Sequence, residues 1–297
     1  MKCDLCPRKC LVDRKKGEKG ICGQTENLKV ARAALHFWEE PCISGDAGSG
    51  AVFFSGCPLH CVFCQNENIA NGTVGKEISL ERLVDIFLEL QEKGANNINL
   101  VTPGHFVPQI VKALDQAKKE GLTLPVVYNT SSYETVDTIK RLEGYVDIYL
   151  PDFKYMSPVL SKKYSHAPDY AEVAKAAIAE MVRQTGKAVF VNGDEDNLIL
   201  RGTIVRHLTL PGCMADSMQI LKYLHETYGD TIYISIMNQF TPLSNLEKYP
   251  ELNCRITDEE YETLVDYAID IGIENGFIQE GDTAEESFIP AFDCEGV

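Results

Sequence analysis

The sequence predicts an α/β protein whose core is a partial (β/α)6 barrel of the TIM type. Short runs rich in Val, Ile and Leu alternate six times with longer amphipathic stretches, which indicates a parallel sheet with helices on its outside. Six strand–helix units are too few to close an eight-stranded barrel. Since 44% of the 297 residues are hydrophobic, the chain can bury a sizeable core.

The expected elements follow one another without a long linker. We predict strands at residues 51–54, 97–102, 124–130, 145–150, 203–210 and 231–236, and helices at 79–92, 107–119, 134–142, 170–184, 216–228 and 256–273. Ser79 is placed to cap the first helix. Residues 188–191 and 197–200 are expected to form a side hairpin, and the acidic, irregular tail 275–297 to cover the open side or mouth of the barrel. We therefore divide the chain into a cysteine-rich metal-binding extension (1–48), the barrel (49–245), and a C-terminal helix and tail packed on it (246–297).

Composition excludes several classes of function. The net charge of −16 would repel nucleic acid and anionic membranes, so we expect neither as a partner. No apolar run approaches the roughly 18 residues that span a bilayer, and residues 1–10 lack the apolar core of a signal peptide. Eleven cysteines, most of them closely spaced, suit metal sites better than a secreted disulfide scaffold. We expect a cytoplasmic protein with reduced or metal-bound cysteines.

Three cysteines form the motif Cys57-x3-Cys61-x2-Cys64 directly after the first expected strand. Three thiolates on one loop can hold three irons of a [4Fe–4S] cubane, whereas most such clusters have four cysteine ligands. The fourth iron would then be open to another ligand. A zinc knuckle or a partial disulfide framework is the alternative interpretation of this loop.

A second group of cysteines precedes the barrel. It comprises Cys3, Cys6, Cys10 and Cys22, with the spacing Cys-x2-Cys-x3-Cys-x11-Cys. Four thiolates of this kind hold either zinc or an iron–sulfur cluster, and the spacing does not choose between the two. Four unligated thiols are the third interpretation.

Polar residues gather where the expected strands end. The candidate binding residues at these positions are Thr102, Asn129, Asp152, Lys154, Arg206 and Asn238. Functional residues of α/β barrels lie at the carboxyl ends of the strands, and charged residues beside buried strands are rarely structural unless they are paired. His207 directly follows Arg206 and is expected to point to the opposite face of the strand.

The cysteine loop, with Phe63 just before its last cysteine, resembles the signature of the radical S-adenosylmethionine (SAM) superfamily. In that superfamily the open iron binds the amino and carboxylate groups of SAM, and the usual core is a partial barrel. The segments 151–154, 129–130 and 205–207 are also similar to motifs of pyruvate formate-lyase activating enzymes. The resemblance implies a SAM site made by Phe63, Thr102, Asn129, Asp152, Lys154, Arg206 and Asn238, with Lys154 at the SAM carboxylate.

The chain also departs from those activating enzymes. Residues 101–105 replace their Gly-Gly-Glu, so the SAM amino group must be recognised differently in detail. The four N-terminal cysteines and the tail segments 277–281 and 288–293 instead resemble an uncharacterised activating-enzyme-like subgroup of radical SAM proteins.

The resemblance implies an oxidoreductase in which a reduced cluster passes one electron to SAM. The resulting 5′-deoxyadenosyl radical abstracts hydrogen from a substrate, so no catalytic residue is needed beyond the cluster and SAM. The implied partners are a flavodoxin- or ferredoxin-type electron donor and a glycyl-radical enzyme as substrate. A radical SAM enzyme that modifies another peptide or a small molecule is the alternative, and a non-enzymatic iron–sulfur or zinc protein that binds a partner is the third hypothesis.

Overall fold

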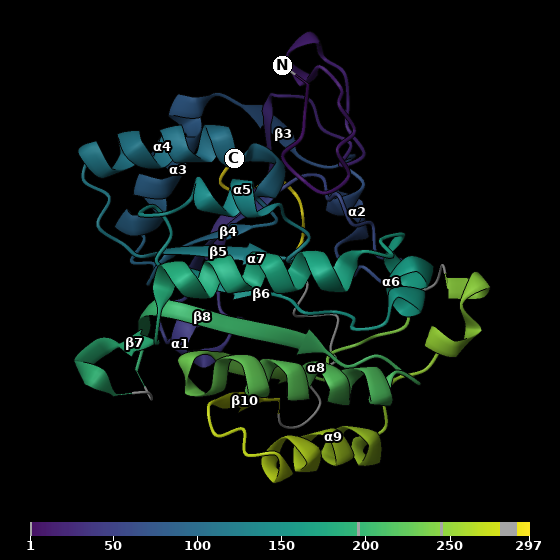
Figure 1. The fold of residues 1–297 in the computed structure, drawn as a ribbon. Coiled ribbons are helices and arrows are strands. Elements are labelled where there is room, and N and C mark those ends of the chain that lie inside the picture. The colour runs from purple at the N-terminus through teal and green to yellow at the C-terminus, as the bar shows by residue number, and fades with distance from the viewer. Residues whose placement is uncertain (1, 195–196, 244–245, 280–289) are drawn as a thin grey trace.

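A computed structural model describes residues 2–194, 197–243, 246–279 and 290–297 (Figure 1). Within these residues, the strands form one sheet in the order β10-β9-β8-β6-β5-β4-β2-β1-β3, with β7 paired to β8. The strands are β1 (Leu28–His36), β2 (Ser49–Phe54), β3 (Lys76–Ile78), β4 (Ile98–Val101), β5 (Val126–Thr130), β6 (Ile148–Pro151), β7 (Val189–Phe190), β8 (Ile199–Leu208), β9 (Tyr233–Met237) and β10 (Gly276–Ile278).

The strands from β2 to β10 along this order all pair in parallel. Val52 lies opposite Leu100, and Leu100 lies opposite Tyr128, so buried side chains are in register across β2, β4 and β5. Among the described residues the sheet begins at β10 and ends at β3 without closing. The predicted α/β fold with an unclosed, mostly parallel barrel is therefore confirmed.

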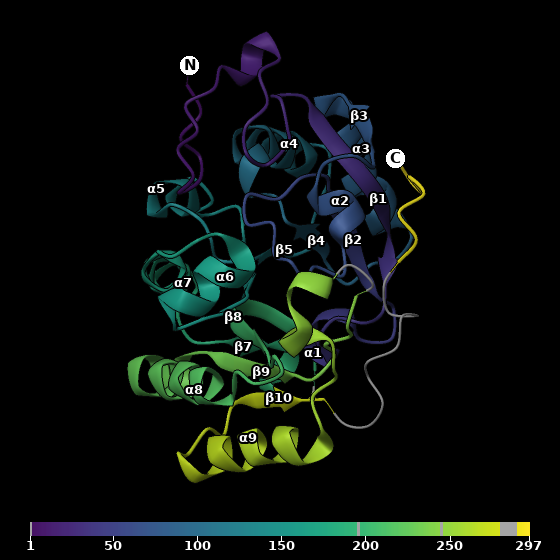
Figure 2. The same ribbon diagram turned by 90° about the vertical axis from the view of Figure 1, so that its right-hand side faces the viewer.

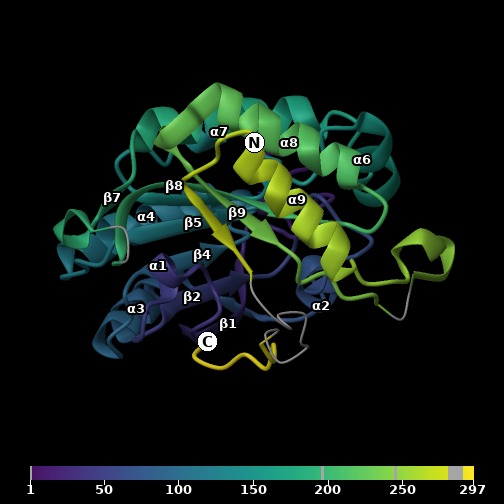
Figure 3. The ribbon, with the colours of Figure 1, turned by 90° about the horizontal axis from the view of Figure 1, so that it is seen from below.

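Helices lie on both faces of the curved sheet, with the longer ones covering its outer face (Figures 1 and 3) and the short α1 and α2 packed against its inner face. They are α1 (Pro41–Ser44), α2 (Glu67–Ala70), α3 (Leu80–Glu92), α4 (Val107–Lys119), α5 (Val136–Lys140), α6 (Pro158–Ser165), α7 (Tyr170–Thr185), α8 (Met214–Tyr228) and α9 (Asp258–Asp270). The Ser79 hydroxyl accepts a hydrogen bond from the Arg82 backbone N–H at 3.1 Å, which confirms the predicted helix cap. No helix in the described ranges is both long and apolar enough to cross a membrane.

Besides α1, α2, α6 and β3, which the sequence analysis did not predict, three elements differ from the prediction. Residues 28–36, where we predicted no strand, form β1 antiparallel to β2. The predicted side hairpin is present, since Phe190 lies opposite Ile199 in an antiparallel pair, but its second strand is not separate because residues 199–200 are the start of β8. Gly202, with φ of +153°, has no Cβ and so lets this long strand pass closely against Ala188. The third difference is β10, which adds a parallel strand where we expected an irregular tail.

The last described residues lie along β1. The Ala33 N–H donates to the Glu295 carbonyl at 2.8 Å, and the Cys294 N–H donates to the Ala31 carbonyl at 3.0 Å. Phe292 packs edge-on against Phe53 of β2, at 5.5 Å between ring centroids. Residues 280, 281, 288 and 289, which belong to the tail motifs of the sequence analysis, lie outside the described residues.

Candidate active site

The cysteine loop begins where β2 ends, so this strand delivers Cys57, Cys61 and Cys64 to the carboxyl-end face of the barrel. Gly56 starts the loop with φ of +93°, a conformation that favours glycine. A side chain at this position would also collide with the Cys22 carbonyl, so the loop and the N-terminal extension approach each other closely here.

Hydrogen bonds to two cysteine sulfurs and the packing of one aromatic ring position the loop. The Leu59 N–H points at the Cys57 sulfur, with the two atoms 3.4 Å apart, and the Ser165 hydroxyl donates to the Cys61 sulfur at 3.0 Å. Phe63 is buried beneath the loop, with its ring centroid 6.4 Å from that of Tyr155. Phe63 therefore packs the loop onto the core and does not line the cavity described next.

A cavity of about 250 Å³ lies directly inside the loop and is lined by all three thiols. Its other polar lining residues come from several strand ends, from the end of β1 and the link after it, and from the segment after Cys64: Thr102, Asn129, Thr130, Ser131, Asp152, Lys154, Arg206, Gln239, His36, Glu39, Gln65 and Asn66. Five of the six strand-end residues predicted from the sequence thus converge on one cavity, namely Thr102, Asn129, Asp152, Lys154 and Arg206. The sixth, Asn238, is not among the lining residues, and its backbone N–H donates to the Gln279 side chain at 2.9 Å.

Four charged side chains form a continuous ladder along one wall of the cavity. The Lys154 ammonium lies 2.6 Å from Asp152 Oδ2. Arg206 donates from Nε to Asp152 Oδ1 and from Nη1 to Glu39 Oε2, each at 3.0 Å, and from Nη2 to Asn129 Oδ1 at 2.7 Å. Two positive and two negative charges alternate in this ladder, so each buried charge has a partner of opposite sign.

The ladder shifts the pKa values of Asp152 and Lys154. Burial raises the pKa of Asp152, but the neighbouring Lys154 and Arg206 outweigh burial and hold this pKa below its usual range. Burial lowers the pKa of Lys154, but Asp152 and the nearby Cys61 outweigh it and raise this pKa. Both side chains are therefore charged at neutral pH, and Lys154 presents a cation close to the cysteine loop.

Glu39 is the site residue that the sequence analysis missed. The link after β1 leaves the strand beside Ser49, at the start of β2, and so reaches the barrel from the end opposite the cysteine loop. Glu39 Oε1 accepts hydrogen bonds from Asn99 at 3.0 Å and from Asn129 at 3.1 Å. The only signal in the sequence was a pair of carboxylates beside the single tryptophan, which does not reveal that the link folds back inside the barrel.

Burial also acts on the three thiols. It raises the pKa of Cys61 to about 11 and that of Cys64 to about 12, with the opposing field of Lys154 lowering both. Without a metal these thiols stay protonated at neutral pH, whereas a bound metal takes them as thiolates.

Comparisons with known proteins agree with this geometry. The family model of the radical SAM superfamily matches residues 51–198, which contain the cysteine loop and the barrel from β2 to β7. Residues 51–198 are a radical SAM domain. The uncharacterized protein MJ0674 of Methanocaldococcus jannaschii is 27% identical over 276 residues, which cover 90% of this chain and 74% of that protein.

Solved structures share the fold of the radical SAM domain. SuiB of Streptococcus suis bound to S-adenosylmethionine has a TM-score of 0.52 at 12% identity, over 76% of this chain and 48% of SuiB. The SuiB structure with its precursor peptide SuiA gives a TM-score of 0.51 at 11% identity, over 76% of this chain and 47% of that one. Methylornithine synthase (PylB) gives 0.51 at 15% identity, over 75% and 60%. This chain thus spans about half the length of SuiB and three fifths of PylB.

The residues present fit the cofactors that the radical SAM family implies, a [4Fe–4S] cluster and SAM. Three thiols from one loop line the same cavity as Lys154, Asn129 and Thr102. Three thiolates are one fewer than a cubane needs, which leaves an iron for a ligand in the cavity.

The four N-terminal cysteines gather outside the radical SAM domain. Cys3 pairs with Val12 through its backbone N–H at 2.9 Å, which folds the segment into a hairpin. The sulfurs of Cys10 and Cys22 lie 3.0 and 3.6 Å from the point where a Cβ on Gly20 would be, so both sulfurs lie close to the same side of this glycine. In the described part of the chain, no group of three or more His, Cys, Asp or Glu side chains is arranged to hold a single metal ion.

Proposed function

We propose that the chain is a radical SAM enzyme that holds a [4Fe–4S] cluster through Cys57, Cys61 and Cys64 and binds SAM in the adjoining cavity. One observation carries the proposal: the three thiols and the charged ladder line the same cavity. When bound, the cluster and SAM supply a 5′-deoxyadenosyl radical that abstracts hydrogen from the substrate. The residues of the chain bind these groups, orient them and exclude water.

Lys154 is the residue that we assign to the SAM carboxylate. Its ammonium is already positioned by Asp152, so an incoming carboxylate meets a fixed cation rather than a mobile one. Arg206 is held by Asp152, Glu39 and Asn129 at once and therefore keeps the Asp152 carboxylate and the Asn129 side chain in place. We assign Asn129 and Thr102 to polar groups of SAM, because both line the cavity beside Lys154.

The substrate that we favour is a glycyl-radical enzyme, as in an activase. Supporting this proposal, Trp38 lines the cavity and is 61% exposed, which indicates that the cavity opens to solvent beside it and could admit a peptide loop. Another peptide is the second candidate, favoured by the fold shared with SuiB, whose structure is known with a precursor peptide. A small molecule is the third, since methylornithine synthase has the same fold.

We also propose that Cys3, Cys6, Cys10 and Cys22 hold a second metal centre, zinc or an iron–sulfur cluster. The closeness of the Cys10 and Cys22 sulfurs to the same side of Gly20 supports this interpretation, and the segment has few apolar residues that could otherwise stabilise it. Metal analysis of a Cys57/Cys61/Cys64→Ala variant separates the cases: one zinc per chain or about four irons with sulfide. Neither metal, with the segment still folded, would refute the site. Because both cysteine groups need reducing conditions, we propose the cytoplasm as the compartment.

The production of 5′-deoxyadenosine tests the main proposal. Anaerobically reconstituted wild-type protein should form it from SAM after reduction, and Cys61→Ala should not. Cys254→Ala is the matched control, because Cys254 is exposed and lies outside both cysteine groups. Equal 5′-deoxyadenosine formation by the wild type and Cys61→Ala would exclude the assigned ligand set.

A further inference from the structure

The four-cysteine segment, residues 2–22, is fastened to the back of the cysteine loop by one arginine. Arg8 donates from Nε to the Pro58 carbonyl at 2.8 Å and from Nη2 to the Leu59 carbonyl at 3.4 Å. The same guanidinium donates to the carbonyls of His166 at 2.6 Å and Ser165 at 3.0 Å, at the C-terminus of α6. Arg8 therefore links the segment to both the cysteine loop and the end of α6, and the segment and α6 lie on the same side of the molecule (Figure 2).

The α6 part of this surface lies close to the proposed cluster, because the inner side of α6 contacts the cysteine loop. The Ser165 hydroxyl in the last turn of α6 touches the Cys61 sulfur at 3.0 Å, and the Tyr164 carbonyl accepts the Val62 N–H at 2.9 Å. The outer face of α6 is thus separated from a cluster ligand by about the width of one helix, ~10 Å.

The surface is positively charged on a strongly acidic protein. Residues 1–22 contain seven Lys and Arg and three Asp and Glu, a net charge of +4, whereas the whole chain carries −16. The remaining residues therefore carry −20. The exposed cations of the segment and of α6, here called the basic surface, are Lys2, Lys9, Lys15, Lys16, Lys19, Lys162 and Lys163. Two of these cations have acidic partners: Lys163 pairs with Glu251 at 2.7 Å, and Lys15 lies 3.9 Å from Glu26.

Apolar side chains are exposed among these cations. Val159 on α6 is 71% exposed, and Leu11 and Ile21 on the four-cysteine segment are 51% and 48% exposed. Protein interfaces combine apolar side chains with a polar, solvent-accessible rim. Among the described residues, none of segment 2–22 and none of α6 lines the cavity, so this surface does not form the substrate site.

We propose that the basic surface is the docking site of the electron donor, an acidic protein that carries one low-potential electron on a flavin or an iron–sulfur cluster. The proposal rests on the proposed function, which requires a reduced cluster. In the step concerned, the reduced carrier loses one electron and becomes oxidised, and the cluster behind Cys61 gains that electron. Complementary charge raises the rate of such encounters tenfold or more at low ionic strength, and salt removes the advantage.

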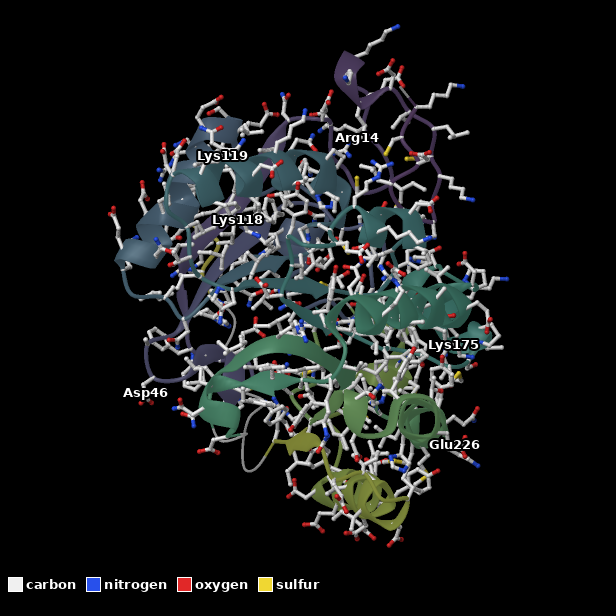
Figure 4. All side chains as sticks on the ribbon, turned by 60° about the vertical axis from the view of Figure 1, so that its left-hand side comes forward. Arg14, Asp46, Lys118, Lys119, Lys175 and Glu226 are labelled. Carbon is white, nitrogen blue, oxygen red and sulfur yellow. The ribbon has the colours of Figure 1, made fainter. Side chains whose placement is uncertain are left out.

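The test compares two double charge reversals. Lys9→Glu/Lys162→Glu changes the basic surface, and Lys118→Glu/Lys119→Glu makes the same charge change at the end of α4, apart from the segment that carries Arg14 (Figure 4). Cluster reduction is followed anaerobically by stopped-flow absorbance with reduced flavodoxin and, separately, with reduced ferredoxin. Photoreduced 5-deazaflavin serves as a small reductant that needs no docking site.

With either protein donor at low ionic strength, we expect Lys9→Glu/Lys162→Glu to be reduced about tenfold more slowly than the wild type, and the control variant to stay within twofold. The difference should vanish at high salt, and all three proteins should react alike with deazaflavin. Equal rates for the basic-surface variant and the wild type with both donors would overturn the docking proposal. If this variant were reduced at the wild-type rate but bound a polypeptide substrate more weakly, the docking proposal would also be overturned, because the surface would then bind substrate rather than the electron donor. A wild-type protein that forms no reducible cluster even with deazaflavin would overturn the proposed function itself.

Discussion

The two cysteine groups lie in neighbouring segments, since a side chain at Gly56 would collide with the Cys22 carbonyl, yet their surroundings differ. Cys57, Cys61 and Cys64 line a cavity whose wall is the ladder of Lys154, Asp152, Arg206 and Glu39. Cys3, Cys6, Cys10 and Cys22 belong to a basic segment that contacts the barrel largely through main-chain carbonyls. Four thiolates can close a metal centre, whereas three leave a position open. The comparison indicates that the number of thiolates and the access to a cavity, rather than cysteine chemistry itself, separate a reactive site from a closed one.

The largest effect should come from removing one cysteine of each group. We expect Cys61→Ala to abolish 5′-deoxyadenosine formation, because the cluster loses one of its three protein ligands. Cys6→Ala should retain most of it when photoreduced deazaflavin supplies electrons, while losing the metal of the outer centre. Product analysis and metal content check both, and loss of cleavage in both variants alike would remove the distinction between the two groups.

Arg206, in the ladder, and Arg8, in the four-cysteine segment, should differ in their contribution to the stability of the fold. Arg206→Leu leaves the Asp152 and Glu39 carboxylates buried without a cation, so we expect the free energy of unfolding to fall by about 3–5 kcal/mol. Arg8→Leu removes hydrogen bonds to carbonyl oxygens nearer the surface and should cost about 1–2 kcal/mol. Anaerobic urea denaturation of both variants measures the difference. Equal losses would show that the ladder is no more important to the fold than the Arg8 contacts.

Glu134 is a buried carboxyl group that accepts hydrogen bonds from hydroxyls and has no cation among its described partners, so its effect on the pH dependence of stability should be opposite to that of the paired Asp152. Burial raises the pKa of Glu134 to about 7, and hydrogen bonds from Thr130 and Tyr128 only partly oppose this. The folded state therefore holds a proton that the unfolded state has lost above about pH 4.5, and the stability falls as the pH rises from about 4.5 to 7. Over this range we expect a loss of about 2–3 kcal/mol that is absent in Glu134→Gln, as measured by denaturation at several pH values. A wild-type curve parallel to that of Glu134→Gln would contradict the raised pKa.

Lys154→Ala should have the smallest effect on the fold and a selective effect on the cavity. Removing its ammonium takes away one charged hydrogen bond to the SAM carboxylate, which corresponds to a loss of SAM affinity of about 10- to 100-fold. The iron content should be unchanged, because Lys154 is not a ligand. Isothermal titration under anaerobic conditions measures the affinity. An unchanged value would make Lys154 a structural partner of Asp152 only.

The sequence predicts the barrel and most of the cavity because both follow from local periodicity. Parallel strands bring their carboxyl ends together, so residues as distant as Thr102 and Arg206 could be placed at one site without knowing any contact. Glu39 could not be found this way, because its position depends on β1 pairing antiparallel to β2 and directing the following link into the barrel. The strand β10 escaped prediction for a similar reason, since three residues show no reliable periodicity. Asn238 follows β9 as predicted, yet adjacency to a strand end does not decide which way a side chain points.

The central claim is that SAM binds at the cluster held by Cys57, Cys61 and Cys64. The most direct test is the electron paramagnetic resonance spectrum of the reduced protein, recorded anaerobically with and without SAM. We expect SAM to change the cluster signal in the wild type and in a Cys3/Cys6/Cys10/Cys22→Ala variant. In a Cys57/Cys61/Cys64→Ala variant, any remaining signal should be insensitive to SAM. A signal that still responds to SAM in this last variant would contradict the account.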